Sequence, residues 1–135
     1  MVIETALVAP VLALMALGTF DVSKMVSKQE DLQSGANEAT EIILAAASGS
    51  GVSSTQLHDI IQSSLDLHAD QVTVEQKFRC DAATALVDSD AGCDASKPVY
   101  KYVKLTLTDS YTPQWTQFGV GQTINYSVVR TVQTA

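Results

Sequence analysis

The first 20 residues form an apolar segment that constrains the fold more than any other part of the chain. Fifteen of them are Ala, Val, Ile, Leu, Met or Phe, and the single charged residue is Glu4. About 20 apolar residues in a helix span a bilayer. A secretory signal is one alternative, but it carries a basic residue before its apolar core, whereas the first basic residue here is Lys24. A buried helix is the other, but a 135-residue chain would struggle to enclose it. The segment therefore predicts a membrane anchor.

Two residues within the segment are unusual for a membrane helix. An ionisable side chain at membrane depth is costly unless it is paired, so Glu4 is predicted to have a function. The alternative is that Glu4 merely lies at the membrane interface. Pro10 removes the amide that would bond the carbonyl of Ala6, and we expect it to bend or loosen the helix there.

The helix is predicted to continue to about residue 48, with Gly49 suited to the position after its last turn. Small or apolar residues recur along it at alternating spacings of three and four, which indicates a packing seam on one side. The seam comprises Val22, Met25, Leu32, Ala36, Ala39, Ile43 and Ala46. We expect it to pack partly against helices of other subunits and partly against the chain's own domain.

The polar remainder predicts a small globular domain. A short amphipathic helix is expected at residues 55–68, after the possible capping hydroxyls of residues 53–55. Alternating β-formers predict strands at 71–80, 99–109 and 124–131. The fold class is therefore α+β: a long N-terminal helix, transmembrane and then amphipathic, followed by a short helix and a small antiparallel sheet of three or four strands. The domain division is 1–48, with 1–20 as transmembrane segment or filament core, and 49–135 as globular head.

Aromatic residues concentrate near the predicted strands. Tyr111, Pro113, Trp115 and Phe118 stand between the last two strands, and we expect them to cover one end of the sheet. An exposed Trp115 that contacts another subunit is the alternative.

Cys80 and Cys93 are the only two cysteines, and in a chain that looks exported they predict a disulfide. Between and beside them, Asp88, Asp90 and Asp94 alternate as calcium ligands do, but the later ligands of a calcium loop are missing, so a solvated acidic turn is favoured and no metal is predicted.

The charge balance and the motifs exclude several classes of function. Eight basic and 15 acidic residues give a net charge of −7, which argues against nucleic acid as a partner. No phosphate loop, nucleophile elbow or zinc motif occurs, and no catalytic site or cofactor is predicted.

The stretch ETALVAPVLALMALGTFDVSK, with Glu4, Pro10, Leu17-Gly18, Asp21 and Lys24, resembles the TadE-like proteins of tight-adherence pili, within the type IV pilin superfamily. The resemblance extends over residues 1–47, and the stretches VKLTLTDSYTP and INYSVVRTV also resemble the strands that end TadE-like chains. It implies a pilin-like fold, and a prepilin whose short basic leader is removed by a prepilin peptidase. The family's Glu is usually the fifth mature residue but here is the fourth, so either one residue precedes Met1 or the cut is shifted.

Processing at this point would leave a positive α-amine, at Met1 or next to it, within apolar surroundings. The Glu4 carboxylate of a neighbouring subunit could neutralise that amine, and such a pair would specify the register between subunits. The implied partners are the inner membrane before assembly, the pilus assembly machinery, and then other pilins or copies of this chain in an extracellular helical filament. Length favours a minor over a major pilin. The alternatives are a membrane-anchored periplasmic domain that does not polymerise and a secreted soluble protein.

Overall fold

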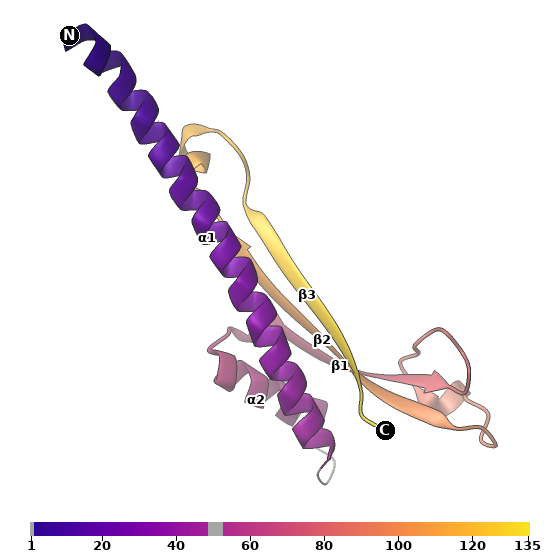
Figure 1. Cartoon of the computed structure of the whole chain (residues 1–135). Helices are drawn as coiled ribbons and strands as arrows, with labels where there is room; N and C mark the ends of the chain where they lie inside the picture. Colours follow the sequence, from indigo (N-terminus) through magenta and orange to yellow (C-terminus); the bar gives the residue numbers. More distant parts are fainter. Residues whose placement is uncertain (1, 49–52) are drawn as a thin grey trace. The chain divides into compact units, whose positions relative to one another are not determined.

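A computed structural model describes residues 2–48 and 53–135 of the chain, apart from the side chains of Val2 and Glu4. The fold is α+β, as the sequence predicts, with two helices and a three-stranded antiparallel sheet among the described residues (Figure 1). In chain order, the helices and strands are α1 Val2–Ala47, α2 Ser54–Leu65, β1 Val72–Cys80, β2 Val99–Tyr111 and β3 Ile124–Gln133. Three short 3₁₀ segments connect them: η1 Ala69–Gln71, η2 Asp90–Gly92 and η3 Gln114–Phe118.

Helix α1 runs through the apolar segment and the seam without interruption. Pro10 lies inside it, and the residues on both sides of Pro10 are helical. The predicted end near residue 48 agrees with the observed end at Ala47, whereas Gly49 lies outside the described residues.

Helix α2 is defined by its two caps. The Ser53 hydroxyl accepts a hydrogen bond from the backbone amide of Gln56, and the Gln56 side chain accepts one from the amide of Ser53. At the other end Asp66 adopts a left-handed conformation, φ 51°, and its amide bonds the carbonyl of Gln62. This cap ends the helix three residues before the predicted residue 68, because a residue in that conformation cannot continue it.

The described backbone divides into two compact units. The first unit comprises α1 up to Asp31 together with Asp109–Tyr126. The second comprises Leu32–Thr108 and Ser127–Ala135. The division predicted at residue 48 separates a membrane-linked helix from a head, and it stays a prediction.

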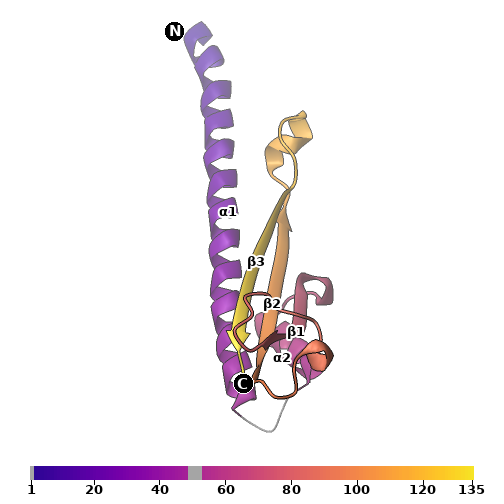
Figure 2. The same ribbon diagram turned by 90° about the vertical axis from the view of Figure 1, so that its right-hand side faces the viewer.

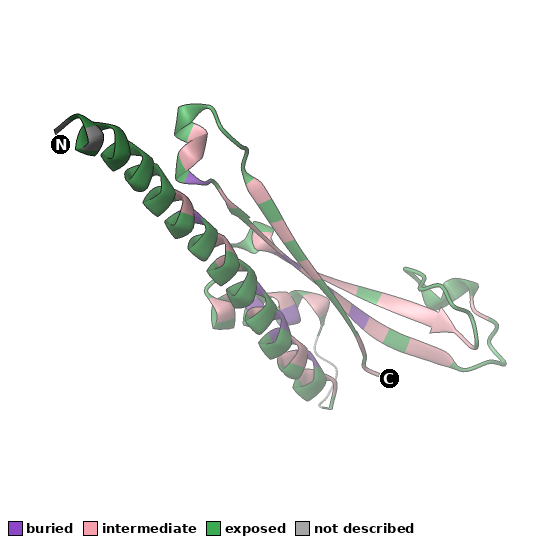
Figure 3. Cartoon of the chain, turned by 45° about the horizontal axis from the view of Figure 1, so that its top comes forward, coloured by how far each residue is buried: buried purple, intermediate pink, exposed green. Residues whose placement is uncertain are grey.

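The second unit contains the hydrophobic core. Within this unit the fully buried apolar side chains come from α1, α2, β1 and β2, and Figure 3 colours them purple. They are Leu32, Ala36, Ala39, Ile43, Leu57, Ile61, Val72, Val103, Leu105 and Leu107. Gly35 allows a close contact in this core, because a Cβ atom there would lie 3.4 Å from a methyl carbon of Leu65.

The sheet has the order β1-β2-β3, with β2 in the centre. Strands β1 and β2 pair in antiparallel register from Val72 opposite Leu107 to Cys80 opposite Val99. Alternate residues of β2 are buried in the second unit, which matches the period-two pattern that predicts this strand.

Candidate functional site

The N-terminal part of α1 presents an apolar surface to its surroundings. Among the described residues, α1 is the one helix long and apolar enough to cross a membrane. Its large apolar side chains are about half exposed or more from one end of the segment to the other, for example 70% at Leu7 and 58% at Phe20. Covering a fully exposed Leu, Val or Phe contributes about 1.5–3 kcal/mol. A surface made of many such side chains therefore requires lipid or protein around it.

The residues predicted to direct assembly are placed only in part. Glu4 belongs to α1, but its side chain lies outside the described residues, as does Met1. Pro10 is exposed within the apolar surface. Pairing between Glu4 and a neighbouring N-terminus therefore stays a prediction.

Asp21 follows the apolar segment directly and is buried in the first unit. Its side chain is 1% exposed. One carboxylate oxygen accepts a hydrogen bond from the hydroxyl of Tyr111 at 2.8 Å, and the other accepts one from the backbone amide of Gln114 at 2.9 Å. Both oxygens are thus used, and the connection between β2 and β3 is attached to α1 where the apolar segment ends.

The same contact affects the phenol of Tyr111. The hydrogen bond to the Asp21 carboxylate raises the pKa of Tyr111, and desolvation of the phenol raises it further. Ionisation would place a second negative charge beside the carboxylate. Tyr111 therefore remains a protonated donor at neutral and mildly alkaline pH.

A second contact joins the same two elements within the first unit. Lys28 lies two turns after Asp21 on α1, and its ammonium group is 2.8 Å from a carboxylate oxygen of Asp109 on β2. Asp109 and Tyr111 are two residues apart on one strand, so their side chains leave the same face. Neither contact can be predicted from the sequence. An acidic residue directly after an apolar helix, such as Asp21, is also typical of a membrane boundary.

The connection after β2 differs from expectation at one residue. Pro113 is buried and Trp115 is half-buried, as expected of residues that cover the end of a sheet. Phe118, however, is 70% exposed, so the prediction that it covers the sheet is wrong. Phe118 is the last residue of η3, and Gly119 in a left-handed conformation follows it directly.

The seam of α1 is buried only in its C-terminal part. Within the second unit, Leu32, Ala36, Ala39 and Ile43 are buried by the chain itself, and Ala46 is half-buried. In the first unit Val22 is 52% exposed and Met25 is half-buried. Among the described seam residues, those at the N-terminal end are therefore the more exposed ones.

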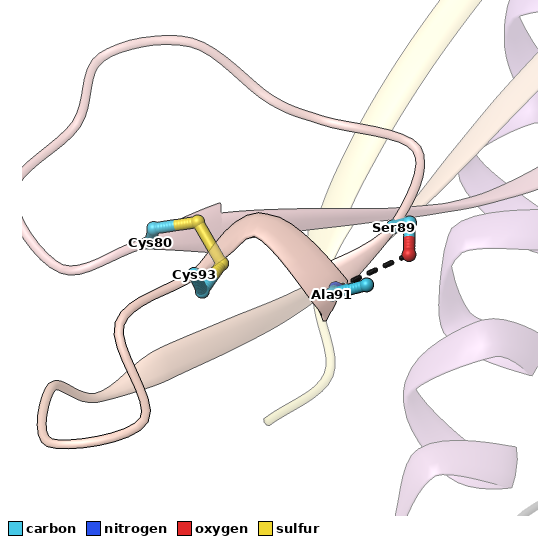
Figure 4. Close-up of a disulfide and its surroundings, with 4 residues drawn as sticks. All are labelled: Cys80, Ser89, Ala91 and Cys93. Carbon is cyan, nitrogen blue, oxygen red and sulfur yellow. Dashed lines mark hydrogen bonds between the residues drawn. A yellow bond between two sulfur atoms is a disulfide. The ribbon is translucent and has the colours of Figure 1, made fainter.

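Cys80 and Cys93 form a disulfide in the second unit, with Cα atoms 5.3 Å apart (Figure 4). Within the bridged loop the hydroxyl of Ser89 accepts a hydrogen bond from the amide of Ala91, which opens η2. Closing a loop of this length contributes roughly 3 kcal/mol in the chain-entropy account.

The three weak calcium candidates around this loop do not gather into a ligand set. Asp88 pairs with the ammonium group of Lys77, and this bond lowers the pKa of Asp88. Asp94 accepts hydrogen bonds from the amide and hydroxyl of Ser96, at 3.0 and 2.8 Å, which lower its pKa. Asp90 begins η2 and is exposed. No group of three potential metal ligands occurs in the described part of the chain.

A cavity of about 440 Å³ lies in the second unit, between the end of α1, α2 and the sheet. Its lining is apolar at Ile43, Leu57 and Val103 and basic at Lys77 and Lys101. Ser53 and Asp90 also line it, and no histidine or cysteine does so among the described residues.

Comparison with known proteins finds a family match for the first part of the chain. Residues 1–41 match the family model described as TadE-like protein. The match confirms the resemblance seen in the sequence over these residues, and it supports a pilin-like protein associated with tight-adherence pili. Proteins of this kind are structural and not enzymes. The chain matched no curated protein and no solved structure.

Proposed function

We propose that the chain is a structural pilin-like subunit of a bacterial extracellular filament of the tight-adherence type. Its α1 helix is stored in the inner membrane and then packs in the filament core, where neighbouring helices replace lipid around the apolar surface. Glu4 pairs with the N-terminus of a neighbouring subunit in this core.

The exposed apolar surface of α1 carries the proposal. The side chains from Leu7 to Phe20 are uncovered by the rest of the chain, and they belong to the residues that match the TadE-like family. Both lipid and the helices of other subunits are apolar and can cover this surface. The family and the helix together suit membrane anchoring, which precedes filament assembly in this proposal.

In this proposal, Glu4 determines the register in which neighbouring subunits pack. Leaving one partner of a buried ion pair uncompensated costs roughly 3–5 kcal/mol. That cost corresponds to more than a hundredfold in an association constant, because each 1.4 kcal/mol is about tenfold. A subunit that enters the filament out of register would leave both Glu4 and a neighbouring α-amine in this state.

One observation favours a second candidate, a membrane-anchored minor pilin or interaction domain that does not itself polymerise. The seam between Leu32 and Ile43 is buried by the chain's own second unit, so it is not available to neighbouring helices. The contact area for a continuous filament core is correspondingly smaller.

Replacement of Glu4 tests the proposal. The Glu4→Ala chain is expressed in a bacterium with tight-adherence machinery, and an antiserum measures it in membranes and in sheared surface filaments. We expect wild-type amounts in the membrane and at least a tenfold loss from the sheared fraction. Glu38→Ala is the matched control, since Glu38 is an exposed acid on the same helix beyond the apolar segment, and it should resemble wild type.

The outcomes separate the two candidates. Normal incorporation of the Glu4→Ala chain would show that the pairing argument is wrong. A wild-type chain that stays in the membrane and never enters the sheared fraction would support the non-polymerising alternative. Negative-stain images of filaments made of this chain alone would establish it as a major pilin.

A further inference from the structure

We infer that the connection Thr112–Thr123, called here the β2–β3 loop, is a second membrane contact that inserts Phe118 and Val120 into the interface of the bilayer spanned by α1. The inference rests on the proposed membrane storage of α1. It assigns a lipid-binding role to a part of the chain that lies about 90 residues beyond the apolar segment.

The position of the loop is the first argument. Asp21 comes immediately after Phe20, the last apolar residue of the segment. Its carboxylate binds Tyr111 at the end of β2 and Gln114 near the start of the loop. All of these residues belong to the first unit. From this point the loop extends toward the N-terminal end of α1, alongside the apolar segment (Figures 1 and 2). The loop is therefore placed where the helix leaves the bilayer.

The composition of the loop is the second argument. No charged residue occurs from Ser110 to Val129, although the chain as a whole carries 23 charged residues. Moving a charged group out of water is costly, and because this stretch has no charged residue, its insertion into the membrane interface does not carry that cost. The loop also contains Trp115, the one tryptophan of the chain, and Trp is enriched at membrane interfaces because its ring is apolar and its N–H is polar.

The exposure of the loop's apolar side chains is the third argument. Phe118 is 70% exposed and Val120 is 62% exposed. These fractions equal or exceed those of most side chains on the apolar surface of α1, such as 52% at Val11 and 59% at Leu12. The loop and the apolar segment of α1, both in the first unit, therefore expose apolar side chains to a similar extent.

The loop is held in one conformation by its own contacts, which lowers the entropy cost of insertion. The hydroxyls of Thr112 and Thr123 lie 2.9 Å apart and close its neck. Gly119 and Gly121 have φ of 74° and 80°, a region that favours glycine. A Cβ atom at Gly121 would lie 2.7 Å from the indole nitrogen of Trp115, so this glycine lets the ring pack against the loop backbone.

The favoured occupant is lipid rather than a neighbouring subunit, because the loop is continuous with the membrane boundary. Lys24 lies one turn after Phe20, with its ammonium group 5.5 Å from the centre of that ring, as in side chains that bridge apolar and polar layers. Interfacial segments sit about 5–10 Å into the boundary between headgroups and acyl chains. Trp115, Phe118 and Val120 would occupy this layer.

Fluorescence of Trp115 tests the inference without any label. The full chain is reconstituted at high dilution in vesicles of zwitterionic and anionic phospholipids that carry a nitroxide either near the headgroup or at the end of the acyl chain. We expect stronger quenching by the shallow nitroxide and protection of Trp115 from aqueous acrylamide. The double variant Phe118→Ser/Val120→Ser should reduce the inserted population on the order of tenfold, so that shallow quenching falls and acrylamide quenching rises.

Leu86→Ser is the matched control, since Leu86 is an apolar residue, 39% exposed, in the disulfide loop of the second unit. This variant should leave the quenching unchanged. If acrylamide quenches Trp115 fully while the chain resists carbonate extraction, the loop does not contact the membrane and α1 alone is the anchor. Quenching that appears only at high protein density would also overturn it, because it would indicate a neighbouring subunit. Extraction of the wild-type chain by carbonate would overturn both the loop contact and the membrane storage of α1.

Discussion

Replacing Asp21 should release the β2–β3 loop from α1 while leaving the rest of the chain folded. The carboxylate accepts two hydrogen bonds, at 2.8 and 2.9 Å, and it is 1% exposed. A hydrogen bond to a charged group contributes about 1.5–3 kcal/mol. Tyr111 is only half-buried and Gln114 is exposed, so water can reach both donors once the acceptor is gone. We therefore take about 1.5 kcal/mol for each of the two hydrogen bonds and expect Asp21→Ala to cost about 3 kcal/mol locally.

Hydrogen exchange at the Gln114 amide measures this cost directly, because that amide is one of the two donors. In detergent micelles, Asp21→Ala should accelerate its exchange by about a hundredfold, since 1.36 kcal/mol is about tenfold. Asp21→Asn should have a smaller effect, because an amide oxygen can accept from Gln114 while the amide nitrogen donates to Tyr111. Asp31→Ala, which removes an exposed acid from the same helix, should change exchange by less than about threefold.

Two results would refute this reasoning. Unchanged exchange at Gln114 in the Asp21→Ala chain would mean that the buried carboxylate does not hold the loop. Faster exchange at Leu105 to the same extent would mean that the whole chain is destabilised, since Leu105 is fully buried in the core of the second unit.

Two further predictions concern pH and redox conditions. The pKa of Tyr111 is raised above its ordinary value of 10.0 in the folded chain, so the stabilisation from its bond to Asp21 should be complete below pH 10.0 and decline as the pH rises through the folded pKa. Titration of phenolate absorbance with Tyr111→Phe as reference checks this, and an ordinary pKa for Tyr111 would contradict it. Replacement of Cys80 and Cys93 by Ser should lower the free energy of unfolding by roughly 3 kcal/mol, measured by denaturant titration of the full chain. Equal midpoints for the oxidised and the Ser-substituted chains would contradict that estimate.

Local patterns in the sequence predict most of the helices and strands. The apolar run and the three-four spacing extend α1 to its observed end, because both patterns act within a few turns of one helix. Strands β1, β2 and β3 likewise follow from alternation, with bounds that differ from prediction by no more than two residues. The end of α2 was predicted too late because a left-handed Asp66 leaves no periodic signal.

Contacts between distant residues could not be predicted in this way. Asp21 and Tyr111 are 90 positions apart, and no sequence pattern around either residue indicates that the two are in contact. The same holds for Phe118, whose aromatic side chain suggests a core position although its surroundings expose it. In the seam, spacing predicts which residues share a face of α1, but not whether that face is covered by the chain itself or by another subunit.

The bond between Asp21 and Tyr111 also closes a large noncovalent ring in the chain. A force applied between the N-terminal helix and the C-terminal strand, as in a filament under tension, can pass through this bond and through the ion pair of Lys28 with Asp109. The 89 residues between Asp21 and Tyr111, which include the disulfide, are bypassed while those bonds hold. A few polar contacts at the end of the apolar segment thus give tension a shorter path from α1 to the end of β2 than the covalent chain does.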